Sequence, residues 1–83
     1  MRITEAPRSA ENERAGIRYE FHMTERERDS KREANVGFCV ACGAENQGVH
    51  PTAYGWPCDR CRDSRVSGME TLRMLEVLRV NDD

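Results

Sequence analysis

The chain has 83 residues, of which 37% are hydrophobic and 34% charged, with a formal net charge of -2 at neutral pH. A chain this short forms at most one domain and buries a small apolar core, so it needs a metal ion or disulfides to stabilise it. The charge balance excludes a protein that grips nucleic acid through a strongly basic surface. No stretch approaches the roughly 20 apolar residues of a membrane span, so we expect no membrane association.

The N-terminal segment is polar. Residues 1–15 are rich in charged side chains and include Pro7, which predicts a flexible N-terminal arm. Residues 1–8 lack the apolar segment of a secretion signal. We therefore expect a cytoplasmic protein, in a compartment where thiols stay reduced and paired cysteines bind metal.

The next segment alternates apolar and polar side chains. Its apolar members are Ile17, Tyr19, Phe21 and Met23. This period of two predicts a half-buried β-strand over residues 17–23. His22 occupies a polar position of that strand, where we expect it to face water without a functional role.

Residues 24–35 are almost wholly charged or small, and Glu and Arg alternate over residues 25–28. Mixed charge of this kind is typical of a solvent-facing segment: a loop, a strand extension or an exposed helical turn. A charged contact surface is the functional alternative.

The C-terminal segment carries a helical pattern. Ser67 and Glu70 have the spacing of a capping box, and the run from Met69 to Val80 predicts an amphipathic helix of about three turns. Its apolar face includes Leu72, Leu75 and Leu78. We expect these leucines to pack on a sheet; if they faced solvent, the helix would be a homodimer or partner surface.

The four cysteines form two pairs with metal-ligand spacing. Cys39 and Cys42 make one CxxC motif, Cys58 and Cys61 make another, and fifteen residues separate the pairs. Each pair in a tight turn directs two sulfurs at one ion, and Zn²⁺ takes four such ligands in a tetrahedron. We therefore predict one Zn²⁺ ion held by all four cysteines. Iron in the same tetrahedral site, disulfides and a redox-active pair are the alternatives.

The pattern favours a structural ion over a catalytic one. A catalytic zinc keeps one coordination position open, whereas four cysteines fill the shell. His50 lies beside Pro51 between the pairs, and we expect it to be a loop residue and not a ligand. No Ser/His/Asp set and no glycine-rich phosphate loop accompanies the cysteines, so we expect no enzyme.

Four residues near the second cysteine pair are candidates for contact with a partner. Trp56 is the only tryptophan, and Arg60, Arg62 and Arg65 follow it. Trp56 has two interpretations: a side chain that shields the metal or packs on the helix, and an exposed platform for a base or a protein. The arginines could contact phosphates, but Asp59 and Asp63 lie between them and reduce the positive potential.

Part of the chain resembles a known family. The residues concerned are Cys39-x-x-Cys42-Gly43, Gly48-Val49-x-Pro51, Tyr54, Cys58-x-x-Cys61, Val66, Gly68, Glu70 and Leu72. This string resembles small zinc-ribbon proteins encoded by bacteriophages and prophages, which typically read CxxCG…GVxPDA…YxCxxCG…VxGAEEL. The resemblance implies a zinc ribbon and a phage origin, and most members have no assigned function. The chain departs from the pattern at Arg62, where a second glycine is usual.

Together these observations predict a small α+β metal-stabilised domain. We expect a zinc ribbon over residues 16–83, with an N-terminal strand and a C-terminal amphipathic helix. The function that fits best is a non-enzymatic phage accessory protein that binds or inhibits a host protein. A nucleic-acid-binding zinc ribbon is the alternative.

Overall fold

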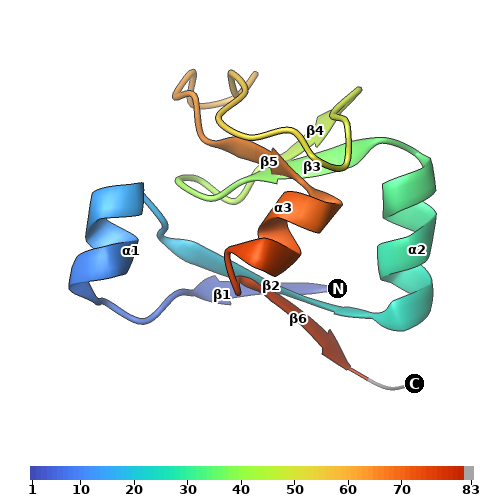
Figure 1. The fold of residues 1–83 in the computed structure, drawn as a ribbon, viewed down its shortest axis with the longest axis horizontal. Helices are drawn as coiled ribbons and strands as arrows, with labels where there is room; N and C mark the ends of the chain where they lie inside the picture. The colour runs from blue at the N-terminus through green and yellow to red at the C-terminus, as the bar shows by residue number, and fades with distance from the viewer. Residues whose placement is uncertain (82–83) are drawn as a thin grey trace.

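The computed structural model describes residues 1–81, and these form six short strands and three short helices (Figure 1). The strands are β1 (Arg2–Glu5), β2 (Tyr19–Thr24), β3 (Val36–Cys39), β4 (Glu45–Gln47), β5 (Val66–Gly68) and β6 (Leu78–Asn81). The helices are α1 (Ala10–Ala15), α2 (Glu25–Glu33) and α3 (Met69–Met74). This small α+β architecture confirms the coarse fold prediction. The predicted end of the domain at residues 82–83 lies outside the described residues.

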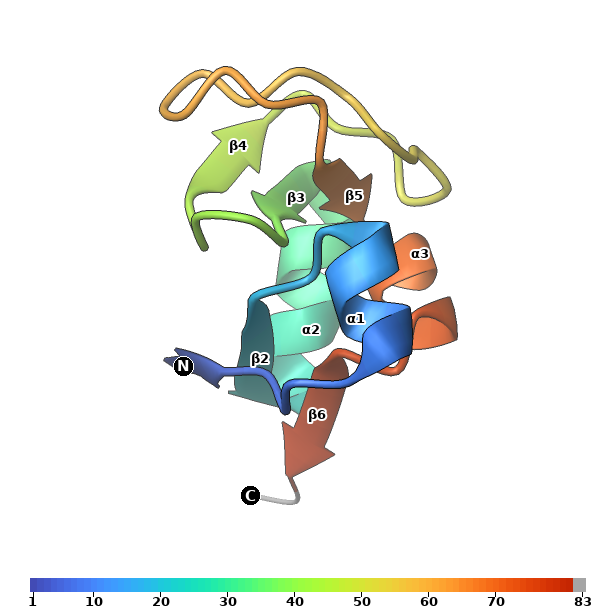
Figure 2. The same ribbon diagram turned by 90° about the vertical axis from the view of Figure 1, so that its left-hand side faces the viewer.

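The strands form two three-stranded sheets. The first has the order β1-β2-β6, in which β1 is antiparallel and β6 parallel to β2. The second has the order β4-β3-β5 and is antiparallel throughout. Figure 2 shows the sheets one above the other, with the loops that follow β4 at the end of the molecule away from the first sheet. The chain leaves the first sheet after β2 and returns to it only with β6.

The main core lies between the two sheets. Phe21 on β2 and Phe38 on β3 are fully buried, with ring centroids 4.9 Å apart. Leu72 on α3 is also fully buried in this cluster. One apolar cluster therefore joins both sheets and α3, and burial of these side chains is the main apolar contribution to folding.

The alternating pattern of the first predicted strand is confirmed in β2. Phe21 and Met23 are buried, whereas His22 between them is half-buried on the other face. Ile17 lies two residues before the strand begins and is buried as well. The apolar period of two therefore identified the face that meets the core.

The predicted flexible arm over residues 1–15 is wrong. Residues 2–5 form β1, which pairs with β2 from Arg2 opposite His22 to Glu5 opposite Tyr19. Residues 10–15 form α1, whose carbonyl at Ala15 accepts a hydrogen bond from the Arg65 guanidinium at 3.1 Å. Both elements depend on partners distant in sequence, which the local composition does not reveal.

The charged segment after β2 is a helix, α2, with no buried residue. Its N-terminus is a capping box: the Thr24 hydroxyl accepts the Glu27 N–H at 3.1 Å, and the Glu27 carboxylate accepts the Thr24 N–H at 3.2 Å. The bond from the Thr24 backbone lowers the pKa of Glu27. Of the interpretations for residues 24–35, the exposed helix is the one observed, and it is longer than one turn.

The predicted three-turn helix over residues 69–80 is wrong in its second half. α3 ends at Met74, and Glu76 has a φ of 62°, a left-handed conformation that no helix continues through. Leu78 then pairs with Phe21 in the parallel register of β6 on β2. Leu72 and Leu78 are both buried, as expected, but the second is buried as part of a strand.

The predicted capping box at Ser67 is also wrong. Ser67 is buried in the middle of β5, opposite Phe38, and the N-cap of α3 is Gly68. The first helical N–H groups instead donate to the carbonyl of Pro51: that of Glu70 at 2.9 Å and that of Thr71 at 3.2 Å. A Cβ atom at Gly68 would clash with the backbone carbonyl of His50, so only glycine permits this approach.

Candidate metal centre

The first cysteine pair spans the end of β3 and the tight turn that leads to β4. The Gly43 N–H donates to the Cys39 carbonyl at 2.8 Å, and the Cys39 N–H donates to the Ala44 carbonyl at 2.9 Å. Gly43 has a φ of 80°, the left-handed conformation that glycine adopts without steric cost. This turn directs the sulfurs of Cys39 and Cys42 to the same side.

The second pair repeats this turn. The Arg62 N–H donates to the Cys58 carbonyl at 2.9 Å, and the Cys58 N–H donates to the Asp63 carbonyl at 2.9 Å. Arg62 has a φ of 66°, close to that of Gly43. The chain thus adopts the same knuckle geometry at Arg62 as at Gly43, at the cost of a left-handed non-glycine residue.

The four sulfurs meet at one point. All four Sγ atoms lie within 4.8 Å of one another, with Cys39 and Cys61 3.6 Å apart and Cys42 and Cys58 3.7 Å apart. A tetrahedral ion with metal–sulfur bonds of about 2.3 Å needs sulfur–sulfur edges of about 3.8 Å. The four cysteines are therefore positioned to bind one metal ion, as the spacing predicted.

The environments of the four thiols differ. Cys39 and Cys58 are buried, Cys42 is half-buried and Cys61 is exposed. Burial raises the pKa of Cys39 to about 12 and also raises the pKa of Cys42. Burial acts in the same direction on Cys58, but hydrogen bonds to its sulfur outweigh it and lower its pKa to about 6.

The hydrogen bonds that lower the pKa of Cys58 come first from the Cys61 backbone, then from the Arg60 backbone and from the Asn46 and Cys42 side chains. The backbone N–H of Arg60 donates to the Cys58 Sγ at 3.4 Å, as expected for the turn of a knuckle. The side-chain amide of Asn46 donates to the same sulfur at 3.6 Å. Donors of this kind stabilise a thiolate and fix the orientation of a metal ligand.

Asn46 is a site residue that the sequence analysis missed. It is buried on β4, and its carbonyl oxygen accepts the Asp59 N–H at 3.1 Å. Its amide also donates to the Ala44 carbonyl at 3.2 Å. Asn46 thus connects the two knuckles. The sequence around Asn46 is polar and lacks any periodic pattern, so it did not indicate this role.

The remaining candidate residues have different surroundings. Arg60 and Arg62 are exposed at the second knuckle, whereas the Arg65 guanidinium is held by the Ala15 carbonyl on α1. Trp56 is 42% exposed, and its backbone pairs with Val66. His50 is exposed and lies outside the cysteine cluster, with its Nδ1 bonded to the Thr52 N–H at 3.1 Å.

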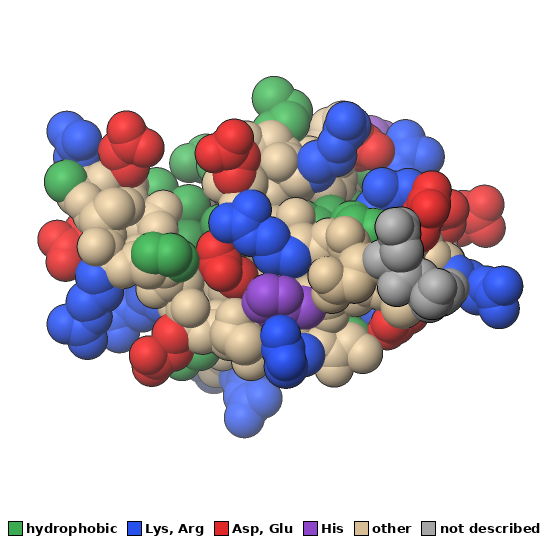
Figure 3. Space-filling view, turned by 90° about the horizontal axis from the view of Figure 1, so that it is seen from below, with side chains coloured by type: hydrophobic (Ala, Val, Ile, Leu, Met, Phe, Trp, Pro, Cys, Tyr) green, Lys and Arg blue, Asp and Glu red, His purple; other side chains and the backbone are tan. Residues whose placement is uncertain are grey.

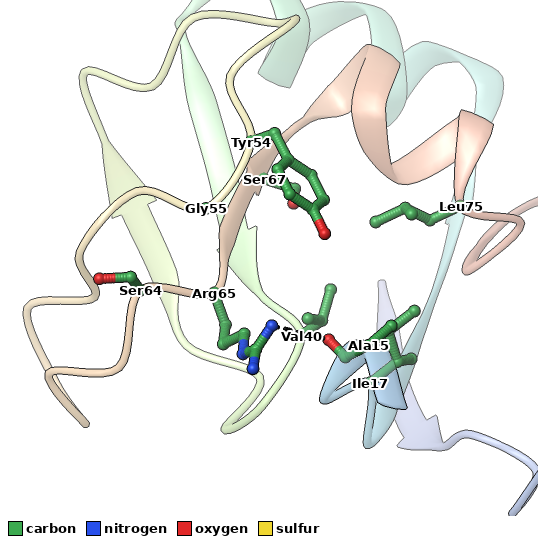
Figure 4. A pocket seen from close by; sticks show the side chains of 9 residues that line it. All are labelled: Ala15, Ile17, Val40, Tyr54, Gly55, Ser64, Arg65, Ser67 and Leu75. Atoms are coloured by element: carbon green, nitrogen blue, oxygen red, sulfur yellow. Dashed lines mark hydrogen bonds between the residues drawn. The ribbon is translucent and has the colours of Figure 1, made fainter. Parts of the chain in front are cut away.

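A small apolar hollow lies beside the second sheet, where the side chains of Tyr54 and Leu75 approach from two elements (Figure 4). Its interior volume is about 10 Å³, which is room for one water-sized group. Two wider hollows occur elsewhere, of about 470 Å³ beside α1 and about 310 Å³ between α2 and α3. No cysteine lines any of the three, so the metal centre does not open into them.

Among residues 1–81 there is no helix with the length and apolar character needed to cross a membrane. Comparison with known proteins finds no matching family model, no matching curated protein and no matching solved structure.

Proposed function

We propose that the four cysteines hold one Zn²⁺ ion and that the domain is a zinc ribbon. The observation that carries this is the cluster of four sulfurs within 4.8 Å, formed by two turns of the same geometry. An all-thiolate tetrahedron suits Zn²⁺, and β3 with its antiparallel neighbours supplies the ribbon.

Elemental analysis of the purified chain tests the identity of the ion. We expect one zinc per chain, and reconstitution with Co²⁺ should give the visible absorption of a tetrahedral thiolate site. Stoichiometric iron, or no metal in a chain with two disulfides, would contradict the proposal.

We further propose that the ion is structural and that the protein is not an enzyme. Four protein ligands leave no position for a substrate or an activated water. Hydrolysis that depends on zinc and disappears in His50→Ala would contradict this.

The protein then acts as a binding module for another protein. Support comes from the loop between the knuckles, where Tyr54 is 62% and Trp56 is 42% exposed. Exposed aromatic side chains are typical anchors of protein interfaces. In line with the family resemblance, we propose a phage accessory protein that binds or inhibits a host protein in the host cytoplasm. Leu72 and Leu78 are buried within the chain, so we propose no homodimer through α3.

Capture from host lysate tests the partner class. Metal-loaded protein should retain a specific host protein, and Trp56→Ala should lose it. Met74→Ala is the matched control, because Met74 is 82% exposed on α3, outside that loop. Equal retention by both variants would contradict a role for Trp56.

Nucleic-acid binding is a second candidate, favoured by the exposure of Arg60 and Arg62 beside the second cysteine pair. A salt titration separates the two. Binding to phosphates should weaken steeply with salt, whereas an apolar protein interface should not.

A further inference from the structure

The outer face of the first sheet carries a row of basic side chains. Phe21 and Met23 point into the core, so His22 between them faces the opposite side of the sheet. In register with His22 stand Arg2 on β1 and Arg79 on β6. The three side chains come from three adjacent strands, with neighbouring Cα atoms about 5 Å apart. Figure 3 shows this face, with a histidine that has basic side chains on both sides.

The two guanidinium groups of this row lie on either side of His22. The Glu20 carboxylate accepts a hydrogen bond from Arg79 at 3.0 Å, and the Glu20 side chain is only 13% exposed. This pair holds the Arg79 guanidinium in place on the sheet. The Thr4 hydroxyl bonds the His22 ring at 2.8 Å and holds the ring in a similar way.

Among the described residues, five basic side chains pair with carboxylates, and Arg79 is one of them whereas Arg2 is not. The other four are Arg28, Lys31, Arg32 and Arg73. Arg2 is exposed in the same row as Arg79. The Arg79 guanidinium is fixed in place and the Arg2 guanidinium has no carboxylate partner within residues 1–81. Such groups suit an incoming anion, because one guanidinium can donate two parallel N–H bonds to phosphate oxygens.

We propose that Arg2, His22 and Arg79 form a binding site for the phosphate group of a small phosphate monoester. A monoester is favoured over a nucleic-acid strand because, among the strand residues of this face in the described part of the chain, none is Phe, Tyr or Trp, on which a base could stack. Tyr54 and Trp56 lie in the loop that joins the knuckles, at the opposite end of the molecule (Figure 1). Arg2 and Arg79 bind the phosphate oxygens, and His22 adds a third donor between them.

The test is an NMR titration of the metal-loaded full chain with inorganic phosphate, with chloride adjusted to constant ionic strength. We expect saturable amide shifts centred on Arg2, His22 and Arg79. Arg2→Gln with Arg79→Gln should weaken binding about tenfold or more, since each charge-assisted hydrogen bond contributes appreciably. Far-UV circular dichroism confirms that the variant is folded.

Arg60→Gln is a control that removes one exposed arginine, at the second knuckle. The affinity of this variant for phosphate should change less than about twofold. Equal weakening by both variants, or shifts that chloride reproduces, would overturn the site. Phenyl phosphate and a single-stranded oligonucleotide, compared as competitors, distinguish the two phosphate sources. Stronger competition by the oligonucleotide would overturn the monoester assignment.

Discussion

Asn46 lies on β4, which follows the first knuckle along the chain, and its side chain contacts the second knuckle. Its amide donates to the Cys58 sulfur, and its oxygen accepts from the Asp59 backbone. Groups that orient a ligand in this way tune metal affinity without touching the metal. At the residue scale, this one side chain hydrogen-bonds to both halves of the site.

Asn46→Ala should lower the affinity for Zn²⁺ about tenfold to a hundredfold, because Cys58 loses a hydrogen bond and the knuckles lose their link. Competition with a chromophoric chelator measures this. Gln47→Ala is the control, since Gln47 is exposed next to Asn46 and its side-chain amide donates to Glu45 on the same strand. An unchanged affinity in the Asn46 variant would show that the backbone alone fixes the site.

Arg62 adopts a left-handed conformation in a turn where Gly43 has nearly the same φ. Replacing it with glycine relieves the steric cost but makes the unfolded chain more flexible. We expect Arg62→Gly to raise the free energy of unfolding by about 0.5–1 kcal/mol, measured by denaturant titration of the metal-loaded protein. Arg60→Gly should give no gain, because Arg60 has no positive φ. A loss of stability at both positions would contradict this account.

At the element scale, α2 is stabilised by its N-terminal cap and by ion pairs from Lys31 to Glu45 and from Arg32 to Glu70. The helix buries no side chain, so packing contributes little to holding it. In this cap, the backbone N–H of Glu27 donates to the Thr24 hydroxyl and that of Thr24 donates to the Glu27 carboxylate, so two N–H groups at the helix start have partners.

Thr24→Ala should therefore lower the free energy of unfolding by about 1 kcal/mol. Ser30→Ala, an exposed change in the same helix, should leave it nearly unaltered. Thermal unfolding followed by circular dichroism compares the two; similar melting temperatures for both variants would rule out a decisive role for the cap.

The C-terminal strand β6 gives a second test of the elements. Leu78 is buried opposite Phe21, whereas Met74 at the end of α3 is 82% exposed. Leu78→Ala should cost about 2–4 kcal/mol, and Met74→Ala should change stability by less than about 0.5 kcal/mol. In addition, the backbone amides of β6 should be protected from hydrogen exchange. If residues 78–81 were instead the frayed end of a helix, these amides would exchange rapidly.

At the scale of the whole molecule, the buried apolar side chains form two clusters. The larger one joins the sheets through Phe21, Phe38 and Leu72, and the smaller one surrounds Cys39 and Cys58. Since β3 contributes to both, the metal centre and the main core are continuous.

Removal of the metal should therefore unfold more than the knuckles. Structural zinc contributes on the order of 10 kcal/mol in small domains, which is comparable to the whole stability of such a protein. We expect chelation to abolish both the near-ultraviolet signal and the far-ultraviolet signal, and added Zn²⁺ to restore them. A native spectrum that survives complete removal of metal would contradict the central role of the ion.

The sequence alone determined the features that depend on local spacing. The two CxxC motifs predicted the cluster of four sulfurs, because a tight turn leaves each pair few directions in which to point. The alternation around Phe21 predicted the buried face of β2 for a similar reason. Both are properties of a few consecutive residues.

Tertiary structure decided the features whose partners are far apart along the chain. The segment Arg2–Glu5 is a strand because β2 supplies its hydrogen bonds, and Leu78 is in a strand because β2 offers a free edge where α3 ends. Asn46 acts on Cys58 because β4 brings it there. Such contacts depend on the position of a second element, and no periodicity within the segment itself encodes that position.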